Sequence, residues 1–505
     1  ESWAVNWESC KLADGESWVT MIPRAEQTKS NEPLIVNREK RRNDINLLRK
    51  NSRQTSIQSK RFRLEKPLQA EHYDQEKVKM MTKNILRKGK DTQNHLKYLR
   101  NAFAESCQNI DAFLEVDNAL YTLVGYLTGN NTTLQLEAVW CLTNITANEN
   151  QNIETFVKAT SAYLITFLKS GSVLLQDQSA WALGNMAADS HNIREILKAQ
   201  GIVKPLTELV ESDVGEVVKS SLFAICNLCK SLQSFVPLVF TPRFIKIIFK
   251  LLNCADTNIF IVGDIAWLLV HFSWNKSGCN LSMEYDFINV LMKRVKLLSP
   301  GTQEYLFVVL PSLRVIGNVI GNQEDVNNLQ LDPSLFDDIV QTANTILLRF
   351  RAKEYVIKEC LWMVSNLFSC PMEDHLSNEV VLRDVQKVVF NIVSNFKSSN
   401  RDIQKEAAVC FCNLSHQPLM QHFKDILTSE DIVLIFMDFL RMDDLDLIWI
   451  SLSYFDLLLN EDKMKIIFQK HNGLSYLEAF QHHPNENIRS KSFQVLQTFG
   501  TAHPS

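Results

Sequence analysis

The chain has 505 residues, of which 46% are hydrophobic and 22% are charged, a composition that excludes a largely disordered chain and allows a large buried core. It holds only 15 glycines and 13 prolines, which favours an all-helical fold over a turn-rich β fold. The net charge of −4 is unevenly distributed, since residues 1–37 carry −3, residues 38–66 carry +8 and the remainder carries −9. A basic segment joined to an acidic body either binds an acidic partner elsewhere or folds back on its own body.

Three segments precede the first clear repeat. Residues 1–37 are polar and aperiodic, and we predict that they are disordered. Residues 38–66 combine helical spacing of apolar residues with eleven Lys and Arg, which predicts a basic helical arm. Residues 67–94 are predicted to be a linker with some helical content, and residues 95–500 to be a solenoid.

A recurring pair of residues marks the repeats: an aromatic residue is followed four positions later by asparagine, or a substitute stands in one of the two places. Successive pairs are separated by 41, 42, 44, 47, 48 and 47 residues, a period typical of a stacked helical solenoid. Because residues i and i+4 share one helix face, stacking places the pairs in two parallel rows along one groove. The seven pairs are Trp140/Asn144, Trp181/Asn185, Phe223/Asn227, Trp267/His271, Arg314/Asn318, Trp362/Asn366 and Val409/Asn413.

The stretch from 176 to 210 shows how one repeat is built. Residues 176–188 and 192–199 have apolar helical periodicity, Gly201 follows them, and Pro205 stands where the next helix is expected. Glycine is favoured just after a helix and proline in its first turn, so a corner between two helices is predicted here. Three helices in a repeat of this length are typical of the armadillo arrangement. We therefore predict an all-α armadillo-repeat superhelical solenoid.

The two rows suit an extended peptide rich in lysine and arginine. An asparagine amide offers a donor and an acceptor to a peptide backbone, and indole faces accept the stem of Lys or Arg with cation–π attraction to its head. For a single pair, a core tryptophan beside a packing asparagine is the competing interpretation. A whole row of buried asparagines is expected to contribute nothing to a core. Counter-charges are expected from Glu137, Asp189, Glu359 and Glu406.

Motifs of other function classes are missing from the sequence. There is no P-loop, no G-x-S-x-G and no H-E-x-x-H, so we expect no enzyme. The single C-x-x-C at Cys226 and Cys229 has no partner pair at zinc spacing, and we expect no metal and no cofactor. The apolar stretch 432–459 carries Asp443 and Asp444 in its middle, which argues against a membrane span. Residues 445–459 and 487–499 keep helical periodicity without the aromatic/Asn pair and are predicted to be capping repeats.

Two segments carry a family resemblance. Residues 134–145 (LQLEAVWCLTNI) and 177–190 (DQSAWALGNMAADS) closely resemble repeats of importin-alpha, a family of adaptors that bind nuclear localisation signals. Residues 311–318 and 358–366 match later repeats of that family, including an arginine in place of the aromatic residue. The resemblance covers roughly residues 38–500 and is weakest at the C-terminus.

The resemblance implies two signal-binding sites in the groove. Three departures from the family pattern indicate a divergent member: Phe223 and Val409 each replace a tryptophan, and His271 stands where a tyrosine is usual. The major site would consist of Trp140, Asn144, Trp181, Asn185, Asp189, Phe223 and Asn227. The minor site would consist of Trp267, Arg314, Asn318, Trp362, Asn366, Glu406 and Asn413.

The basic arm resembles the importin-beta-binding segment of the same family, which can also mimic a cargo signal. The resemblance implies cargo proteins with basic signals, importin-beta and an export factor as partners, and shuttling between cytoplasm and nucleus. A solvated basic tail or an RNA-binding arm is the alternative for this segment, but Phe62 is its only aromatic residue and we expect no nucleic acid. For the whole chain, the alternative is an armadillo scaffold without transport activity that binds another extended peptide, including one at a membrane. The arm residues are Lys40, Arg41, Arg42, Arg49, Lys50, Lys60 and Arg61.

Overall fold

The computed structural model describes residues 73–147, 153–274, 276–298, 305–321, 332–370, 378–416 and 418–501. The segment predicted to be disordered, the basic arm and the first part of the predicted linker lie outside the described residues. Within the described ranges the regular structure is helical and no strand occurs, which confirms the predicted all-α class. The helices fall into two compact units, of which one ends at Phe272 and the other begins at Ser273. We call them the N-terminal unit and the C-terminal unit.

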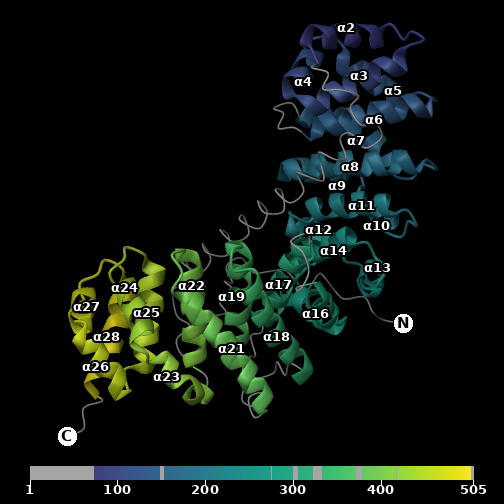
Figure 1. Cartoon of the computed structure of the whole chain (residues 1–505). Helices are drawn as coiled ribbons and strands as arrows, with labels where there is room; N and C mark the ends of the chain where they lie inside the picture. The colour runs from purple at the N-terminus through teal and green to yellow at the C-terminus, as the bar shows by residue number, and fades with distance from the viewer. Residues whose placement is uncertain are drawn as a thin grey trace. The chain divides into compact units, whose positions relative to one another are not determined.

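The N-terminal unit is a stack of helices that follow one another in chain order (Figure 1). They are α2 (Gln75–Leu86), α3 (Thr92–Glu105), α4 (Cys107–Leu114), α5 (Ala119–Leu127), α6 (Thr132–Thr146), α7 (Ile153–Phe167), α8 (Val173–Asp189), α9 (His191–Ala199), α10 (Val203–Leu209), α11 (Gly215–Leu228), α12 (Leu232–Val239), α13 (Pro242–Asn253) and α14 (Ile259–Phe272).

The C-terminal unit continues the same plan. Its helices are α15 (Lys276–Glu284), α16 (Phe287–Leu298), α17 (Leu306–Gly321), α18 (Pro333–Arg349), α19 (Glu354–Phe368), α21 (Glu379–Phe396), α22 (Arg401–Ser415), the 3₁₀ helix η5 (Pro418–Phe423), α23 (Lys424–Leu427), α24 (Glu430–Phe439), α25 (Leu445–Leu458), α26 (Asp462–Lys470), α27 (Gly473–Phe480) and α28 (Glu486–Thr501).

One helix of each repeat forms a continuous inner stack in each unit. In the N-terminal unit α3, α6, α8, α11 and α14 pack in that order, and in the C-terminal unit α17, α19, α22, α25 and α28 do so. We call these ten helices the ladder helices. Except in α3 and α28, the central turns of these helices are apolar on all sides, as expected for a helix packed between neighbours, and most of their residues are buried. The repeats α9–α11, α12–α14 and α26–α28 each contain the three helices that the armadillo plan requires.

Side-chain caps and one glycine fix where these helices begin and end. Ser172 caps α8 by accepting a hydrogen bond from the Leu175 amide, and Asn131 caps α6 in the same way. Gly201 adopts a φ of 77°, which an L side chain rarely adopts, and this turns the chain between α9 and α10. The corner predicted from the sequence is therefore confirmed, although α10 begins at Val203 rather than at Pro205.

Two segments of the chain take a more specific form than the sequence suggested. Residues 75–86 of the predicted linker form α2, which packs against α3, α4 and α5. The apolar stretch 432–459 is divided between α24 and α25. Among the described helices, none is long and apolar enough to cross a membrane.

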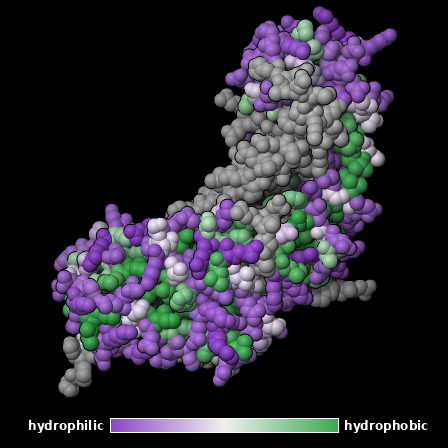
Figure 2. Space-filling view, in the orientation of Figure 1, coloured by the Kyte–Doolittle hydropathy of each residue, from purple (hydrophilic) through white to green (hydrophobic). Residues whose placement is uncertain are grey.

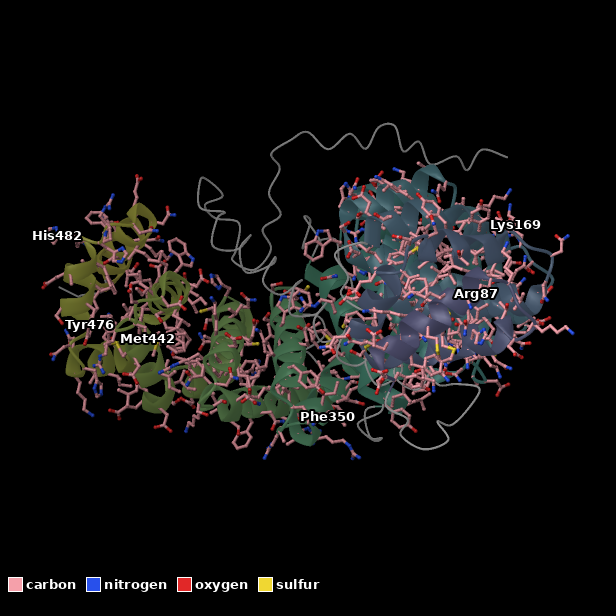
Figure 3. The ribbon with its side chains drawn as sticks, turned by 90° about the horizontal axis from the view of Figure 1, so that it is seen from above. Arg87, Lys169, Phe350, Met442, Tyr476 and His482 are labelled. Carbon is pink, nitrogen blue, oxygen red and sulfur yellow. The ribbon has the colours of Figure 1, made fainter. Side chains whose placement is uncertain are left out.

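Polar contacts join the helices of the last repeats at the surface. Arg441, just after α24, donates from Nε to the Tyr476 hydroxyl of α27 at 2.8 Å. Tyr476 and the neighbouring Met442 are labelled in the part of the C-terminal unit that the last repeats form (Figure 3). Most of the visible surface of each unit is hydrophilic, with hydrophobic residues showing in patches (Figure 2).

Candidate peptide-binding ladder

The predicted pairs lie on successive ladder helices, and two groups of them stand in different units. Trp140/Asn144, Trp181/Asn185, Phe223/Asn227 and Trp267/His271 lie on α6, α8, α11 and α14 of the N-terminal unit. Arg314/Asn318, Trp362/Asn366 and Val409/Asn413 lie on α17, α19 and α22 of the C-terminal unit. All of these side chains are buried except those of Asn318 and Val409, which are half-buried. The residues predicted for the major site thus share one unit, whereas Trp267, predicted for the minor site, lies in the other unit from Arg314.

The asparagines hold adjacent repeats together. Five of the six donate from the amide nitrogen to a backbone carbonyl of the preceding ladder helix, where the loss of such a bond would leave a buried polar group unsatisfied, and Asn318 donates to the Ser273 hydroxyl at 3.0 Å. The expectation that a row of asparagines contributes nothing to a core is therefore wrong. The bonds run from Asn144 to Arg100 (2.8 Å), Asn185 to Thr143 (3.1 Å), Asn227 to Gly184 (2.9 Å), Asn366 to Gly317 (2.8 Å) and Asn413 to Ser365 (2.7 Å).

Two of the aromatic rings pack against a glycine of the preceding ladder helix. The Phe223 ring lies on Gly184, where a Cβ atom would come within 2.6 Å of it, and the Trp362 ring lies on Gly317 in the same manner. The centroids of the Trp181 and Phe223 rings are 5.4 Å apart at a tilt of 43°. A methylene stem held between two ring faces needs about 7 Å, twice the optimal carbon–carbon contact. A ligand side chain must therefore pass along these two rings rather than between them.

Two guanidinium groups already occupy ring faces. Arg314 lies with its Cζ 4.2 Å from the centroid of the Trp362 ring, and its Nη2 pairs with the Glu359 carboxylate. Arg100 of α3 repeats the arrangement at the Trp140 ring, also at 4.2 Å, and its Nη1 lies 2.9 Å from Glu137 Oε2. Stacking plus an ion pair is the recognition mode that the sequence predicted for a ligand arginine.

Buried carboxylates accompany the rings. Glu137, Glu359 and Glu406 are buried one helical turn before Trp140, Trp362 and Val409, as the sequence indicated. Asp177 and Asp264 occupy similar positions before Trp181 and Trp267 and were missed, although the spacing of three or four residues could have identified them. Asp177 accepts a hydrogen bond from the Ser220 hydroxyl at 2.5 Å. Asp189, by contrast, is exposed at the last residue of α8.

Sequence reasoning also missed a ladder position on α25. Trp449 stands 40 residues after Val409, is half-buried, and follows Asp446 by three residues. Ser453 takes the place of the asparagine, which is why the repeat was predicted to lack a pair. Lys491 of α28 approaches this ring, with Nζ 6.0 Å from its centroid, and pairs with Asp456 at 2.8 Å. The shorter step from Val409 and the acidic residue before the ring were the available signals.

The cysteines of the ladder helices belong to the packed interior. Burial raises the pKa of the Cys141 thiol above its usual range, with Glu137 adding to the effect and Arg100 opposing it. Burial likewise raises the pKa of Cys410 and Cys360. Cys226 and Cys229 are buried as well. The raised pKa holds the thiols of Cys141, Cys360 and Cys410 in the protonated form, which is a poor nucleophile and a poor metal ligand.

Known proteins resemble this chain along most of its length. Importin subunit alpha-9 of Arabidopsis thaliana is 25% identical over 388 residues, which cover 72% of this chain and 70% of the relative. Importin subunit alpha-2 of Oryza sativa subsp. japonica is 26% identical over 399 residues, which cover 75% and 73%. These relatives confirm the resemblance to importin-alpha.

Solved structures confirm the armadillo solenoid. An engineered protein superposes with a TM-score of 0.67 at 19% identity, over 85% of this chain and 99% of the engineered one. A chain from a structure concerning a phosphorylation switch in the interaction between cadherin and beta-catenin gives a TM-score of 0.63 at 13% identity, over 85% and 84%. At such identities the likeness concerns the fold alone.

A family model matches most of the chain. Phe223, His271 and Val409 mark a divergent relative of importin-alpha, of the kind represented by transmembrane and coiled-coil domain-containing protein 6. The model described as TMCO6 matches residues 78–499, which is most of the chain and includes every ladder helix from α6 to α25. The chain therefore belongs to the TMCO6 family.

Proposed function

We propose that this chain is a nuclear import adaptor. Its ladder helices would bind Lys/Arg-rich nuclear localisation signals, and its basic N-terminal arm would bind importin-beta. Shuttling between cytoplasm and nucleus, with return by an export factor, belongs to the same proposal. The importin subunits among its relatives support this assignment.

The observation that carries the proposal is the contact of Arg314 with Trp362 and Glu359. A guanidinium stacked on an indole and paired with a buried carboxylate is how a groove of this type would hold a basic cargo residue. Such a cation–π contact is worth about 0.5–2 kcal/mol, depending on how far water is excluded. The protein's own arginine thus demonstrates the chemistry that the remaining rings and carboxylates would offer to a ligand.

Asparagine and aspartate side chains complete the polar part of the site. The amide nitrogen of Asn366 is used by Gly317, but its Oδ1 accepts no hydrogen bond from any described residue. This oxygen is buried, so a backbone N–H of an extended peptide could reach it only if the neighbouring residues moved aside. Asp189 stands at the C-terminal end of α8, where a negative charge is disfavoured by the helix dipole. An acidic residue at such a place is suited to pairing with a lysine of the ligand.

A second function is favoured by two observations. The close approach of the Trp181 and Phe223 rings, and the replacement of a ring by Val409, leave fewer stem-binding slots than a ladder of tryptophans would provide. A scaffold that binds another extended peptide, without transport activity, fits this reduced ladder. The two functions differ in the basic residues that the ligand must carry.

A fluorescence-polarisation titration of the full chain with a lysine-rich signal peptide tests the proposal. The control is the same peptide with each lysine replaced by glutamine, and we expect saturable binding of the first peptide only. Importin-beta binding is measured in parallel with the full chain and with the triple variant Lys40→Glu, Arg41→Glu and Arg42→Glu. Equal binding of both peptides, or none of either, would rule out signal recognition and favour the scaffold.

A further inference from the structure

Three cations of the chain occupy positions in the aromatic row itself. Arg100 stands 40 residues before Trp140, Arg314 stands 48 residues before Trp362, and Lys491 stands 42 residues after Trp449. These separations match the steps between the aromatic positions, so each cation lies on the ladder helix next to that of a tryptophan. The helix pairs α3 and α6, α17 and α19, and α25 and α28 pack directly against one another.

Arg314 fills the space on one side of the Trp362 ring. Arg314 is only 5% exposed, and its guanidinium covers the ring from α17, three residues before Gly317, on which the same ring lies. Its ion pair with Glu359 uses the carboxylate that a ligand cation at this ring would need. A ligand can reach this face only by displacing Arg314, which would leave a buried charge without its partner.

Arg100 provides an independent instance of the same arrangement. Its distance to the Trp140 ring and its partner Glu137, three residues before the ring, match those of Arg314. Lys491 is a looser version, with an ammonium at the Trp449 ring and Asp456 as its carboxylate partner. The recurrence at three separate places points to a shared role rather than to an accident of packing.

We propose that Arg100, Arg314 and Lys491 are built-in occupants of ligand slots, and that they fix where a bound peptide can begin and end. In the N-terminal unit, Arg100 ends the row of usable rings at Trp140. In the C-terminal unit, Arg314 and Lys491 mark the two ends of a short row of usable rings that runs from Trp362 to Trp449. This inference rests on the proposed function for its consequence on peptides, but the occupancy of the slots can be tested without any peptide.

The test replaces the occupant and supplies its head group from solution. Arg314→Ala opens a space between the Trp362 ring and Glu359, and N-acetyl-arginine amide is the probe. Because a ligand that binds only the folded state stabilises it, the probe should raise the melting temperature of Arg314→Ala at millimolar concentration. The probe should not change the melting temperature of the parent chain. It should also not change that of Arg314→Met, in which an apolar stem fills the space. N-acetyl-glutamine amide serves as the matched probe without a cation.

A peptide experiment then addresses the boundary. A lysine-rich peptide extended by one arginine at either end should bind Arg314→Ala about two- to thirtyfold more tightly than the parent, the range of one cation–π contact, and should bind Arg314→Met no better. Both the thermal stabilisation by the probe and the peptide affinity are also measured for Arg100→Ala in the N-terminal unit. This variant provides the test if Arg314→Ala does not fold. Absence of thermal rescue in both alanine variants overturns the inference. Thermal rescue without peptide binding by any form of the chain supports the occupied slots and refutes the proposed function instead.

Discussion

Asn366 of α19 donates its amide nitrogen to the carbonyl oxygen of Gly317 on α17, at 2.8 Å, across the interface between two repeats. The same carbonyl belongs to the glycine on which the Trp362 ring lies. One glycine therefore accommodates both members of the next pair, because a Cβ atom there would come within 2.2 Å of the ring. The pair that the sequence marked for ligand binding is also the pair that joins the repeats.

Asn366→Ala should destabilise the fold. The side chain is 1% exposed, and removing a buried hydrogen bond of this kind costs about 1–3 kcal/mol. Chemical denaturation of the full chain measures the effect. The control Asn94→Ala removes an exposed asparagine of α3 and should change the free energy of unfolding little. Equal stability of both variants would show that the bond to Gly317 contributes nothing.

Asp189→Asn should separate binding from stability. Removing a negative charge from the C-terminal end of α8 is expected to stabilise the chain by about 0.3–1 kcal/mol, because the helix dipole opposes that charge. Affinity for a lysine-rich peptide should fall roughly two- to fivefold, the value of an exposed ion pair. Titration and thermal unfolding of the same samples measure both, with Asp213→Asn as an exposed control outside the ladder. Unchanged affinity would remove Asp189 from the site.

Trp181→Ala combined with Asn185→Ala should lose both peptide binding and stability. The loss of a buried aromatic anchor and its neighbour is expected to cost about 2–4 kcal/mol of binding free energy. The melting temperature should fall as well, because Asn185 bonds to Thr143 and Trp181 contacts Phe223. Peptide titration at a temperature where the variant is folded, confirmed by circular dichroism, separates the two effects. Retained affinity in the folded variant would contradict the assignment of the major site.

The second basic cluster of a bipartite signal should add little affinity in the parent chain, because Val409 supplies no ring. Val409→Trp should increase that contribution by supplying the missing ring. Ser365 of the preceding ladder helix stands where Gly317 accommodates the Trp362 ring, but Thr143 takes the same place below Trp181, so a residue with a Cβ atom there is compatible with a tryptophan. Isothermal titration with bipartite and monopartite peptides compares the two chains. A large gain from the second cluster in the parent would show that Arg314, Trp362 and Asn366 suffice without a ring at position 409.

Deletion of residues 1–66 should raise the affinity for a signal peptide. The arm carries a basic cluster like that of a cargo signal, and its covalent attachment to the solenoid would hold it at an effective concentration on the order of millimolar. Importin-beta, by binding the arm, should raise the affinity of the full chain to that of the truncated one, since such coupling is reciprocal. Equal affinity of both chains in the absence of importin-beta would show that the arm does not compete with cargo.

The repeat plan could be predicted because its signals are local. Gly201 and Pro205 mark a corner within a few residues of one another, and the period of the pairs counts repeats without any tertiary information. The role of the asparagines could not be predicted in this way. Asn366 and Gly317 are 49 residues apart, and nothing near either residue indicates that one will donate to the other.

The candidate site was predicted in its residues but only partly in its geometry. Asp177 and Asp264 follow the same spacing as Glu137 and could have been found from it. The stacking of Arg100 on Trp140 depends on which faces the helices turn to one another, and the sequence does not encode this directly. Trp449 does not stand out in the sequence because Ser453 replaces the asparagine that follows the other aromatic residues by four positions.

The hydrogen bonds that the ladder asparagines donate between repeats all have the same direction along the chain. In each case the later repeat supplies the donor and the earlier repeat supplies the acceptor, as Asn185 does for Thr143 and Asn413 does for Ser365. Domains are synthesised from the N-terminus and generally begin to fold in that order. Each asparagine leaving the ribosome therefore meets a carbonyl whose helix has already been completed, so that the solenoid can be assembled one repeat at a time without waiting for its C-terminal end.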